Sequence, residues 1–375
     1  EMTQDIAYYQ AIDLLKQMIA TPSTSRDETA VADILESYLK KESGLEVRRL
    51  GNNVWVVAPD FNPSRKTLLL NSHCDTVKPS ATWTKDPFAP IEETVENAQG
   101  KVETRLYGLG SNDAGASLVS LLHVFLMLKD SPQKYNLIFL ASCEEEVSGA
   151  NGIDAVLKHW ESEAENTNIS LLPDLAIVGE PTCMRAAVAE KGLLVLDGVA
   201  HGKAGHAARN EGINALYIAL DAIQKLRYYK FEKESPTLGP VKITVSVING
   251  GTVHNVVPDE CKFVVDVRST DAYTNEETLK TLQELIAPVE LSPRRMKLHS
   301  SGIPETHPLV ERVKMLGIET FGSPTLSDQA LLSCQSIKMG PGDSARSHTA
   351  DEYICLDEIR EAISIYYTLL NGLSF

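Results

Sequence analysis

The first forty residues carry apolar side chains at the spacing of an α-helix. The apolar positions are Ile12, Leu15, Ile19, Val31, Ile34, Leu35 and Tyr38. The segment TPS at residues 21–23 interrupts them, so the pattern predicts two helices within Asp5–Leu39. We expect Thr24 or Ser25 to cap the second helix, because a hydroxyl there can accept hydrogen bonds from the first turn.

Short, nearly continuous apolar runs follow, and each ends in polar residues. We expect buried strands at Asn53–Val57, Thr67–Leu70, Asn136–Ala141 and Leu175–Val178. Helical stretches lie between them at Ala116–Lys129 and Ile153–Glu161. Buried strands that alternate with helices predict an α/β fold in which helices are layered on a sheet.

Residues from about 191 onward follow a different order of elements. Strands and helices are expected at Leu193–Val199, Asn214–Tyr229, Val241–Ile248, Cys261–Val267, Asn275–Ile286 and Val289–Leu298. This βαββαβ order is that of a ferredoxin-like unit. A chain of 375 residues is long enough for two or three domains. We expect two: residues 191–296 are inserted into a larger domain made of residues 1–190 and 297–375.

The last part returns to helices and a short strand. We expect helices at Leu309–Glu319 and Leu356–Leu370, and a strand at Ile337–Met339.

The composition excludes several classes of protein. Hydrophobic residues make up 43% and charged residues 23%, as in an ordinary folded protein. The net charge is 35 − 51 = −16, which disfavours nonspecific binding to nucleic acid or to an anionic membrane. The N-terminal segment EMTQDIAYYQ does not have the pattern of a signal peptide. Six cysteines without a CxxC pair favour reduced thiols and a cytoplasmic protein.

Ionisable residues gather where the predicted strands end. They are His73, Asp75, Asp113, Glu144, Glu145, Glu146, Glu180 and His348. Open α/β sheets bind ligands at the carboxyl ends of their strands, so we expect these side chains to meet. Each alone has an ordinary structural explanation, such as a helix cap for Asp113. Together, three consecutive acids repel one another unless a cation is near, and two histidines with carboxylates suit zinc.

A series of motifs then makes a resemblance specific. The motifs are SHCDTV, WTKDPF, YGLGSNDAG, EEE, VGEPT, GKAGHAARNEGINA, NGG with HNVVP, DVRS, and GPG with SHTADEY. They resemble those of the di-zinc amidohydrolase and metallopeptidase family that contains acetylornithine deacetylase, succinyl-diaminopimelate desuccinylase and carboxypeptidase G, and they occur in that family's order from residue 72 to 353. YGLG, IVGEPT and the short insert are most similar to acetylornithine deacetylase. The chain departs from the family where DAGA replaces Asp-Met-Lys-Gly at residues 113–116 and where EEE replaces Asp-Glu-Glu.

The resemblance implies a fold and a metal centre. The fold would be a zinc-peptidase-like mixed sheet flanked by helices, with the insert as a lid and dimerisation domain. The centre would hold two Zn²⁺ ions per chain, with Co²⁺ or Mn²⁺ as possible substitutes. Its implied ligands are His73, Asp113, Glu146, Glu180 and His348, with Asp113 bridging the two ions. Asp75 would orient His73 through its other ring nitrogen. A cis peptide between Asp113 and Ala114 is implied as well.

The resemblance also implies the roles of the remaining site residues. Glu145 would move the proton of the attacking water. His206 would donate a hydrogen bond to the oxyanion from the partner subunit, which implies a homodimer through the insert. Arg268 would hold the α-carboxylate of the substrate, and Asn255 would contact the substrate or shape its pocket. Gly342, with Gly340, would let the backbone approach the site.

The expected activity is hydrolysis of the amide bond of an N-acyl amino acid. N-acetyl-L-ornithine, cleaved to L-ornithine and acetate in arginine biosynthesis, is the first candidate by resemblance. N-acetylcitrulline, N-succinyl amino acids and small peptides remain open. A nucleotide-binding enzyme is disfavoured because Asp113 breaks the GxGxxG pattern, and no GxSxG motif of a serine hydrolase is present. A non-catalytic binding module is disfavoured because Glu145 and all five implied ligands are present.

Overall fold

The chain forms two compact units, each with its own hydrophobic core. A computed structural model describes residues 1–375. The main unit contains residues 1–188, 303–321 and 327–375, and the inserted unit contains residues 189–302 and 322–326. The expected insert, residues 191–296, lies within the second of these. The inserted unit also includes residues 322–326, a short return of the chain that no pattern in the sequence indicated.

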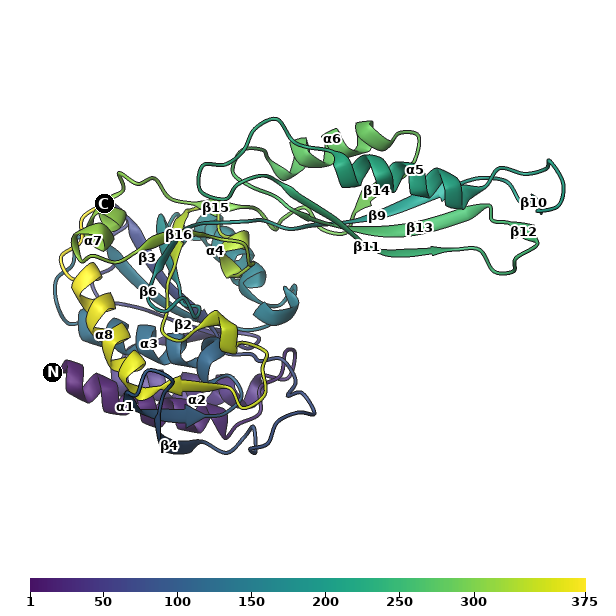
Figure 1. Ribbon diagram of the computed structural model, residues 1–375. Coiled ribbons are helices and arrows are strands. Elements are labelled where there is room, and N and C mark those ends of the chain that lie inside the picture. Colours follow the sequence, from purple (N-terminus) through teal and green to yellow (C-terminus); the bar gives the residue numbers. More distant parts are fainter. The chain divides into compact units, whose positions relative to one another are not determined.

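A mixed sheet runs through the main unit, as expected for the fold (Figure 1). Its strands, in spatial order, are β1 (Val47–Leu50), β2 (Asn53–Val57), β6 (Asn136–Ser142), β3 (Thr67–His73), β7 (Leu175–Val178), β17 (Gln335–Lys338) and β8 (Ala186–Glu190), with β16 (Thr320–Ser323) paired to β8. The short strand β15 (Ser301–Gly302) belongs to the inserted unit and pairs with the last two residues of β8. The four central strands β6, β3, β7 and β17 are parallel. Their carboxyl ends therefore share one edge, where ligands bind in such sheets.

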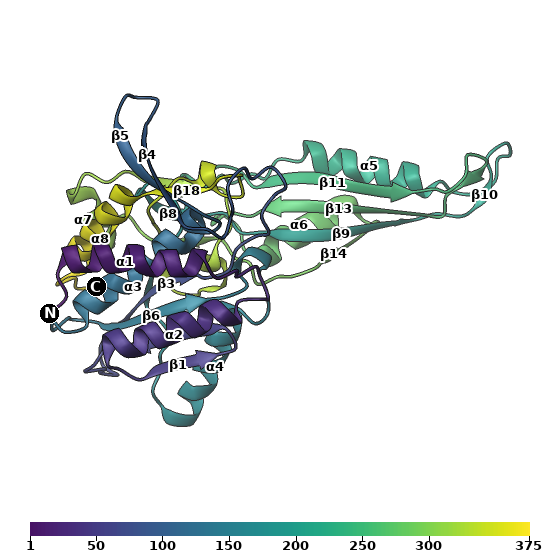
Figure 2. The ribbon, with the colours of Figure 1, turned by 90° about the horizontal axis from the view of Figure 1, so that it is seen from below.

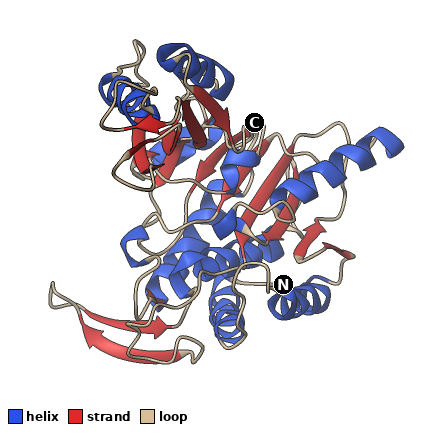
Figure 3. Cartoon of the chain, turned by 90° about the vertical axis from the view of Figure 1, so that its right-hand side faces the viewer, coloured by secondary structure: helices blue, strands red, loops and turns tan.

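Helices cover both faces of this sheet (Figure 3). One face packs against α1 (Gln4–Ile19), α2 (Thr29–Ser43), α3 (Ala116–Leu128), α7 (Pro308–Met315) and α8 (Leu356–Leu370), and the other against α4 (Ile153–Thr167). Side chains alternate between the faces of β3. Leu68 and Leu70 join the core with the five helices, and Leu69 joins the core of α4 beside Trp160. Each such buried leucine stabilises the fold by about 1.5–3 kcal/mol.

Helix α3 is apolar on all sides because it lies between other elements. With the preceding π-helical turn η1 (Ser111–Gly115), it makes one 18-residue stretch, Ser111–Leu128, that is long and apolar enough to cross a membrane. The structure buries 94% of that stretch. A core helix that is covered on every side meets the same criteria of length and composition.

A small antiparallel sheet connects two segments that are far apart in sequence. It consists of β18 (Tyr353–Cys355), β5 (Val102–Tyr107) and β4 (Ile91–Glu96), and the β4–β5 hairpin extends from the main unit in Figure 2. Pairing of Tyr353 with Tyr107 brings the residues before β18 next to the loop after β5. The first of these segments contains His348 and the second contains Asp113, so this sheet helps to assemble the site.

The inserted unit has the expected βαββαβ order. Its elements are β9 (Leu194–His201), α5 (Ala215–Tyr228), β11 (Lys242–Gly250), β13 (Glu260–Arg268), α6 (Asn275–Ile286) and β14 (Glu290–Pro293). The strands form an antiparallel sheet in the order β11-β13-β9-β14. A separate two-stranded ladder pairs β10 (Gly205–His206) with β12 (Val256–Val257).

The expected hydroxyl cap of the second helix is wrong. Helix α2 begins after Glu28, which makes no side-chain cap. The Ser25 hydroxyl instead donates to Asp75 Oδ2 at 2.7 Å, and Thr24 forms a backbone bridge with Thr76. Ser25 lies three residues before Glu28, the residue that precedes α2, so its hydroxyl is not placed at the start of the helix and contacts Asp75 instead.

Candidate metal centre

Three predicted site segments converge at the carboxyl edge of the parallel strands. His73 is the last residue of β3 and is paired in register with Ser142, the last residue of β6. The acidic triplet begins two residues after Ser142, and Glu180 follows β7 by two residues. The parallel register of β3 with both neighbours therefore delivers one histidine and two acidic segments to one place.

Two further segments complete the cluster from outside the large sheet. Asp113 lies in η1, at the start of the chain segment that becomes α3. His348 follows the short 3₁₀ helix η4 (Ser344–Arg346) and has a positive φ of 58°. The peptide bond between Asp113 and Ala114 is cis, which confirms that expectation.

Asp113 lies between the two histidines. Its Oδ1 is 3.2 Å from His73 Nε2, and its Oδ2 is 3.3 Å from His348 Nε2. His73 Nε2 is also 3.4 Å from Glu180 Oε1, and His348 Nε2 is 3.0 Å from Glu146 Oε2. The five residues thus form two adjacent groups of donors that share the Asp113 carboxylate.

These donors fit divalent cations. Two ligand atoms on a tetrahedral zinc ion, each about 2.0–2.1 Å from it, are about 3.3 Å apart, close to the separations within this cluster. Glu180 Oε1 is buried and accepts no hydrogen bond, which is rare for a carboxylate unless a cation is bound. Three-donor groups with all ligand atoms within 4.8 Å are His73-Glu145-Glu180 and His73-Asp113-Glu146.

The environment of His73 favours the tautomer that can bind a metal. Its Nδ1 lies 2.9 Å from the backbone carbonyl of Asp75 and must donate to it, because a carbonyl only accepts. In the neutral ring the Nε2 lone pair then faces Asp113 and Glu180. The Asp75 carboxylate is 3.3 Å from the same Nδ1, so both groups of Asp75 lie beside this nitrogen.

The Asp75 carboxylate has a second role that no sequence motif indicated. Its Oδ1 accepts the backbone N–H of Glu145 at 3.0 Å, and its Oδ2 accepts that of Glu146 at 3.1 Å. Burial opposes ionisation of Asp75, but hydrogen bonds and the nearby His73 outweigh burial and lower its pKa. Asp75 therefore holds the acidic loop by its main chain and leaves the side chains of Glu145 and Glu146 directed to the cluster.

The first acid of the triplet is not part of the cluster. Glu144 has a positive φ of 55°, and its N–H donates to Glu28 Oε1 at 3.0 Å. Its own Oε2 accepts the N–H of Asn151 at 3.1 Å. Glu28 is fully buried, and its burial raises its pKa. Glu144 and Glu28 thus shape the turn that presents the next two acids.

The site lacks positive charge relative to its carboxylates. Burial raises the pKa of Glu145 well above its usual value, and burial raises that of Glu180 to about 7. Hydrogen bonds to Asp113 and Glu146 raise the pKa of His348 to about 10. Both kinds of shift are typical of a partly buried cluster that concentrates negative charge with little positive charge to balance it. Added cations are therefore stabilised at this place.

The glycines of the GPG segment permit close contacts. A Cβ on Gly340 would lie 2.4 Å from the carbonyl oxygen of Glu180, and a Cβ on Gly342 would lie 2.2 Å from Asn112 Oδ1. Gly342 also has a φ of 87°, which favours glycine. Gly342 thus packs closely against Asn112, which belongs to the loop that carries Asp113.

The three other predicted site residues lie in the inserted unit. His206 is on β10, and the carbonyl of Asn255 accepts the N–H of Ala207, so His206 and Asn255 belong to one ladder. Arg268 ends β13, and its guanidinium donates to both carboxylate oxygens of Asp266 at 2.8 and 3.1 Å. The five donor residues described above all lie in the main unit.

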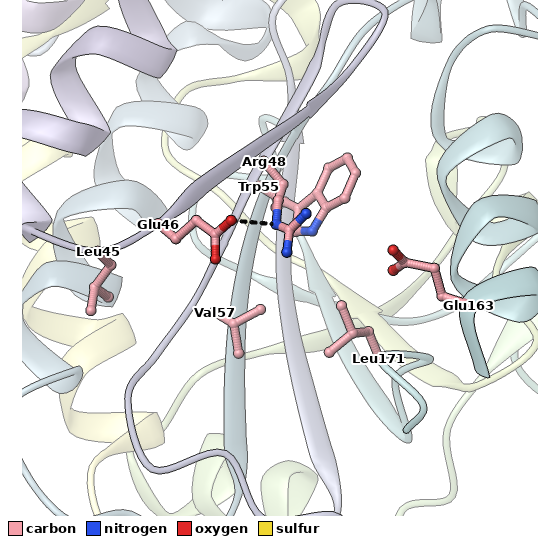
Figure 4. A pocket seen from close by; sticks show the side chains of 7 residues that line it. All are labelled: Leu45, Glu46, Arg48, Trp55, Val57, Glu163 and Leu171. Atoms are coloured by element: carbon pink, nitrogen blue, oxygen red, sulfur yellow. Dashed lines mark ion pairs between the residues drawn. The ribbon is translucent and has the colours of Figure 1, made fainter. Parts of the chain in front are cut away.

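A pocket of about 320 Å³ lies on different elements of the main unit (Figure 4). Its lining residues are Leu45, Glu46, Arg48, Trp55, Val57, Glu163 and Leu171. Arg48 pairs with Glu46 at 3.1 Å, as the dashed line in Figure 4 marks. None of the predicted site residues lines this pocket, so it is separate from the metal-ligand cluster.

Comparison with protein families identifies the chain. The model of the family described as "Peptidase family M20/M25/M40" matches residues 69–372, which include every predicted site residue. The chain belongs to this family. It is therefore an M20-family hydrolase, and its cluster of His, Asp and Glu donors offers candidate ligands for a divalent metal.

Curated M20 relatives extend over nearly the whole chain. It is 30% identical over 373 residues to an acetylornithine deacetylase of Klebsiella pneumoniae (strain 342), with 92% of each chain covered. It is 29% identical over 378 residues to an acetylornithine deacetylase of Erwinia tasmaniensis, again with 92% of each covered.

Solved structures share the fold. A tripeptidase of Staphylococcus aureus is 20% identical with a TM-score of 0.72, covering 97% of both chains. The YXEP protein of Bacillus subtilis, described as a dinuclear metal binding peptidase from the M20 family, is 15% identical with a TM-score of 0.71 and covers 98% of this chain and 100% of its own. These structures confirm the mixed α/β fold.

Metal removal by a chelator, followed by addition of Zn²⁺, tests whether the cluster binds metal. We expect Zn²⁺ to stabilise chelator-treated protein, by about 2.7 kcal/mol at a free concentration 100 times the Kd. Asp113→Asn should lose most of this gain, because one carboxylate faces both histidines. Thermal unfolding with and without Zn²⁺ measures the gain. Glu163→Gln, which removes an acid on α4 away from the cluster, should keep it; equal gains in both variants would contradict the site.

Proposed function

We propose that the protein hydrolyses the amide bond of an N-acyl amino acid with two bound Zn²⁺ ions, and that N-acetyl-L-ornithine is its substrate. The observation that carries this proposal is the Asp113 carboxylate between His73 and His348, with Glu145 at the same cluster. The names of the curated relatives support the acyl group and the amino acid. Co²⁺ or Mn²⁺ would substitute for zinc.

Glu145 would carry the proton through the reaction. When bound, the two cations polarise the amide carbonyl and make water easier to deprotonate. Glu145 takes a proton from the attacking water, whose oxygen forms a bond to the carbonyl carbon. As the C–N bond breaks, Glu145 gives that proton to the departing nitrogen, so acid and amine leave and the carboxylate is restored.

The position of Glu145 supports this role. Its Oε2 is 3.5 Å from His73 Nε2, and its main chain is held by Asp75. Burial raises its pKa, which makes it a stronger proton acceptor once it is ionised. Because Glu145 also belongs to a three-donor group with His73 and Glu180, its assignment as proton carrier rather than ligand depends on the family resemblance.

His206 is proposed to stabilise the oxyanion. Its Nδ1 accepts the N–H of Ala208 at 3.1 Å, so the neutral ring carries its proton on Nε2. The ring is exposed, so this N–H is open to a group from outside the inserted unit. A donor of this kind suits an oxyanion formed in the site of a second copy.

Arg268 and Asn255 are proposed to bind the substrate. Asp266 already occupies one edge of the Arg268 guanidinium, through Nε and Nη2. The remaining N–H groups of the guanidinium would bind the substrate α-carboxylate. Asn255 would contact the substrate beside His206. Gly342 would act with Gly340 by permitting the close backbone contacts described above.

A homodimer through the inserted unit is part of the proposal. Strand β11 is an edge of its sheet, and Val247 and Ile248 on it are 44% and 43% exposed. Tyr217 and Leu220 of the neighbouring helix α5 are exposed as well. An unpaired apolar edge strand is suited to pairing with a second copy of the same strand. All six cysteines are free, which supports the cytoplasm as the compartment.

A panel of amides tests the substrate. We expect the highest kcat/KM for N-acetyl-L-ornithine among this compound, N-acetylcitrulline, N-succinyl amino acids and small peptides. Arg268→Ala should raise KM for each substrate with an α-carboxylate and leave KM for the corresponding carboxamide unchanged. A preference for tripeptides or N-succinyl compounds would replace the proposed substrate and leave the amide chemistry in place.

Glu145 can be tested separately from the metal. Glu145→Ala should retain about two zinc ions per chain and lose most of kcat, since the proton carrier contributes about 10²–10⁴-fold. Metal analysis and steady-state kinetics on the same preparation measure both. If kcat stays at the wild-type value, Glu145 is not the proton carrier; if a zinc ion is lost, Glu145 is a ligand.

The oligomeric state tests the inserted unit. We expect sedimentation at about twice the chain mass of 41.1 kDa. Ile248→Lys should shift the protein to monomers, because a charge at the edge strand opposes pairing. Ile6→Lys on α1 is the matched control, since Ile6 is 44% exposed in the main unit. A wild-type monomer, or equal effects of both changes, would refute the proposed interface.

A further inference from the structure

Glu352 is a buried acid beside the metal-ligand cluster, and none of the roles above includes it. It lies between η4 and β18, four residues after His348, and is 3% exposed. A buried carboxylate needs strong hydrogen bonds to remain in the fold. Its partners therefore indicate what it does.

All the hydrogen bonds to the Glu352 carboxylate come from the loop that carries Asp113. Oε1 accepts the N–H of Gly110 at 2.9 Å, and Oε2 accepts those of Asn112 at 2.9 Å and Asp113 at 2.8 Å. The Glu352 backbone carbonyl also accepts the N–H of Gly108 at 3.0 Å. Three backbone N–H groups turned toward one side chain form a compact binding site for its oxygens. Burial raises the pKa of Glu352 to about 8, and the hydrogen bonds from these N–H groups oppose that rise.

These bonds connect two ligand-bearing segments. Glu352 belongs to the segment that carries His348, and it binds the main chain of Asp113. The same two segments meet again where His348 Nε2 lies 3.3 Å from Asp113 Oδ2. Because Glu352 uses only main-chain donors of the loop, both oxygens of the Asp113 side chain remain directed to the histidines.

The other side of the same loop is held independently. Asn112 Nδ2 donates to the carbonyl of Asp343 at 2.9 Å, and Asn112 Oδ1 accepts the N–H of Asp343 at 3.0 Å. The loop is thus fixed to the C-terminal segment at Asp343 and at Glu352. Only the Glu352 contact includes the N–H of Asp113 itself.

We propose that Glu352 is a positioning residue of the metal centre, which holds the Asp113 carboxylate at bridging distance from His348. The proposal rests on the proposed metal-dependent function, since it assigns Glu352 a role toward the bound cations. A purely structural Glu352 would affect the stability of the fold and leave metal affinity unchanged. Residues that orient metal ligands in this way change affinity by about 10–100-fold when they are replaced.

Two variants of Glu352 remove different numbers of its hydrogen bonds to the Asp113 loop. Glu352→Ala removes all three side-chain hydrogen bonds. Glu352→Gln keeps an oxygen for the N–H groups of Asn112 and Asp113 and turns an amide NH₂ toward Gly110, which loses one bond. Asp351→Asn is the matched control, because it removes one negative charge from the adjacent residue, whose partners are Thr84 and Lys85.

The experiment measures Zn²⁺ affinity by competition with a chromophoric chelator, the visible spectrum of the Co²⁺-loaded protein, kinetics and thermal unfolding. We expect Glu352→Ala to weaken the affinity by about 10–100-fold and to shift the Co²⁺ bands, with a smaller effect of Glu352→Gln and none of Asp351→Asn. In the loaded enzyme kcat should fall while KM changes little.

Wild-type affinity and an unchanged Co²⁺ spectrum in both Glu352→Ala and Glu352→Gln would overturn the proposal. If Glu352→Ala fails to fold, the same result in Glu352→Gln alone would overturn it. So would equal effects of Asp351→Asn and Glu352→Ala. The metal measurements need no substrate. If the wild-type enzyme cleaves none of the N-acyl amino acids, the proposed function fails while the affinity comparison still decides the role of Glu352.

Discussion

Asp113 has its carboxylate between two histidines, and much of the main unit is organised to keep it there. Each of its oxygens is 3.2–3.3 Å from a different imidazole nitrogen. Burial disfavours the charge on Asp113, and the neighbouring His348 and His73 overcome burial and hold its pKa far below the usual range. A carboxylate in this position remains ionised only if its neighbours are fixed, because a small displacement would leave a buried charge without a partner.

The surrounding acids are kept in place mainly through the backbone. Asp75 holds the N–H groups of Glu145 and Glu146, Glu28 holds that of Glu144, and Glu352 holds that of Asp113. In each case one carboxylate fixes the main chain, and the side chains of other residues face the cluster. Several like charges can thus be concentrated in a small volume without competing for the same donors, which leaves their oxygens available for cations.

The parts of the fold that the sequence predicted are those with continuous burial. Strands β2, β3, β6 and β7 stood out as apolar runs because they are covered on both faces. Strands β4 and β5 were missed because most of their residues are polar and only partly buried, and β18 because it has three residues. The sequence predicted that His73 and Glu180 lie close together, because both follow the ends of predicted strands. It did not predict the positions of Glu352 and Glu28. Their partners are backbone N–H groups, which every residue except proline has and no sequence motif marks.

The position of His348 in the chain has a consequence for assembly during synthesis. His348 follows Asp113 by 235 residues, and the whole βαββαβ segment lies between them. A ribosome therefore completes one group of donors, with His73, Asp113 and Glu180, long before the histidine of the other group exists. Domains generally fold as units while a chain is made, but this main unit cannot close until its last portion emerges. Until then the nascent chain carries the acids of the cluster with a single imidazole, so the proposed metal centre can be completed only after the C-terminal segment is translated.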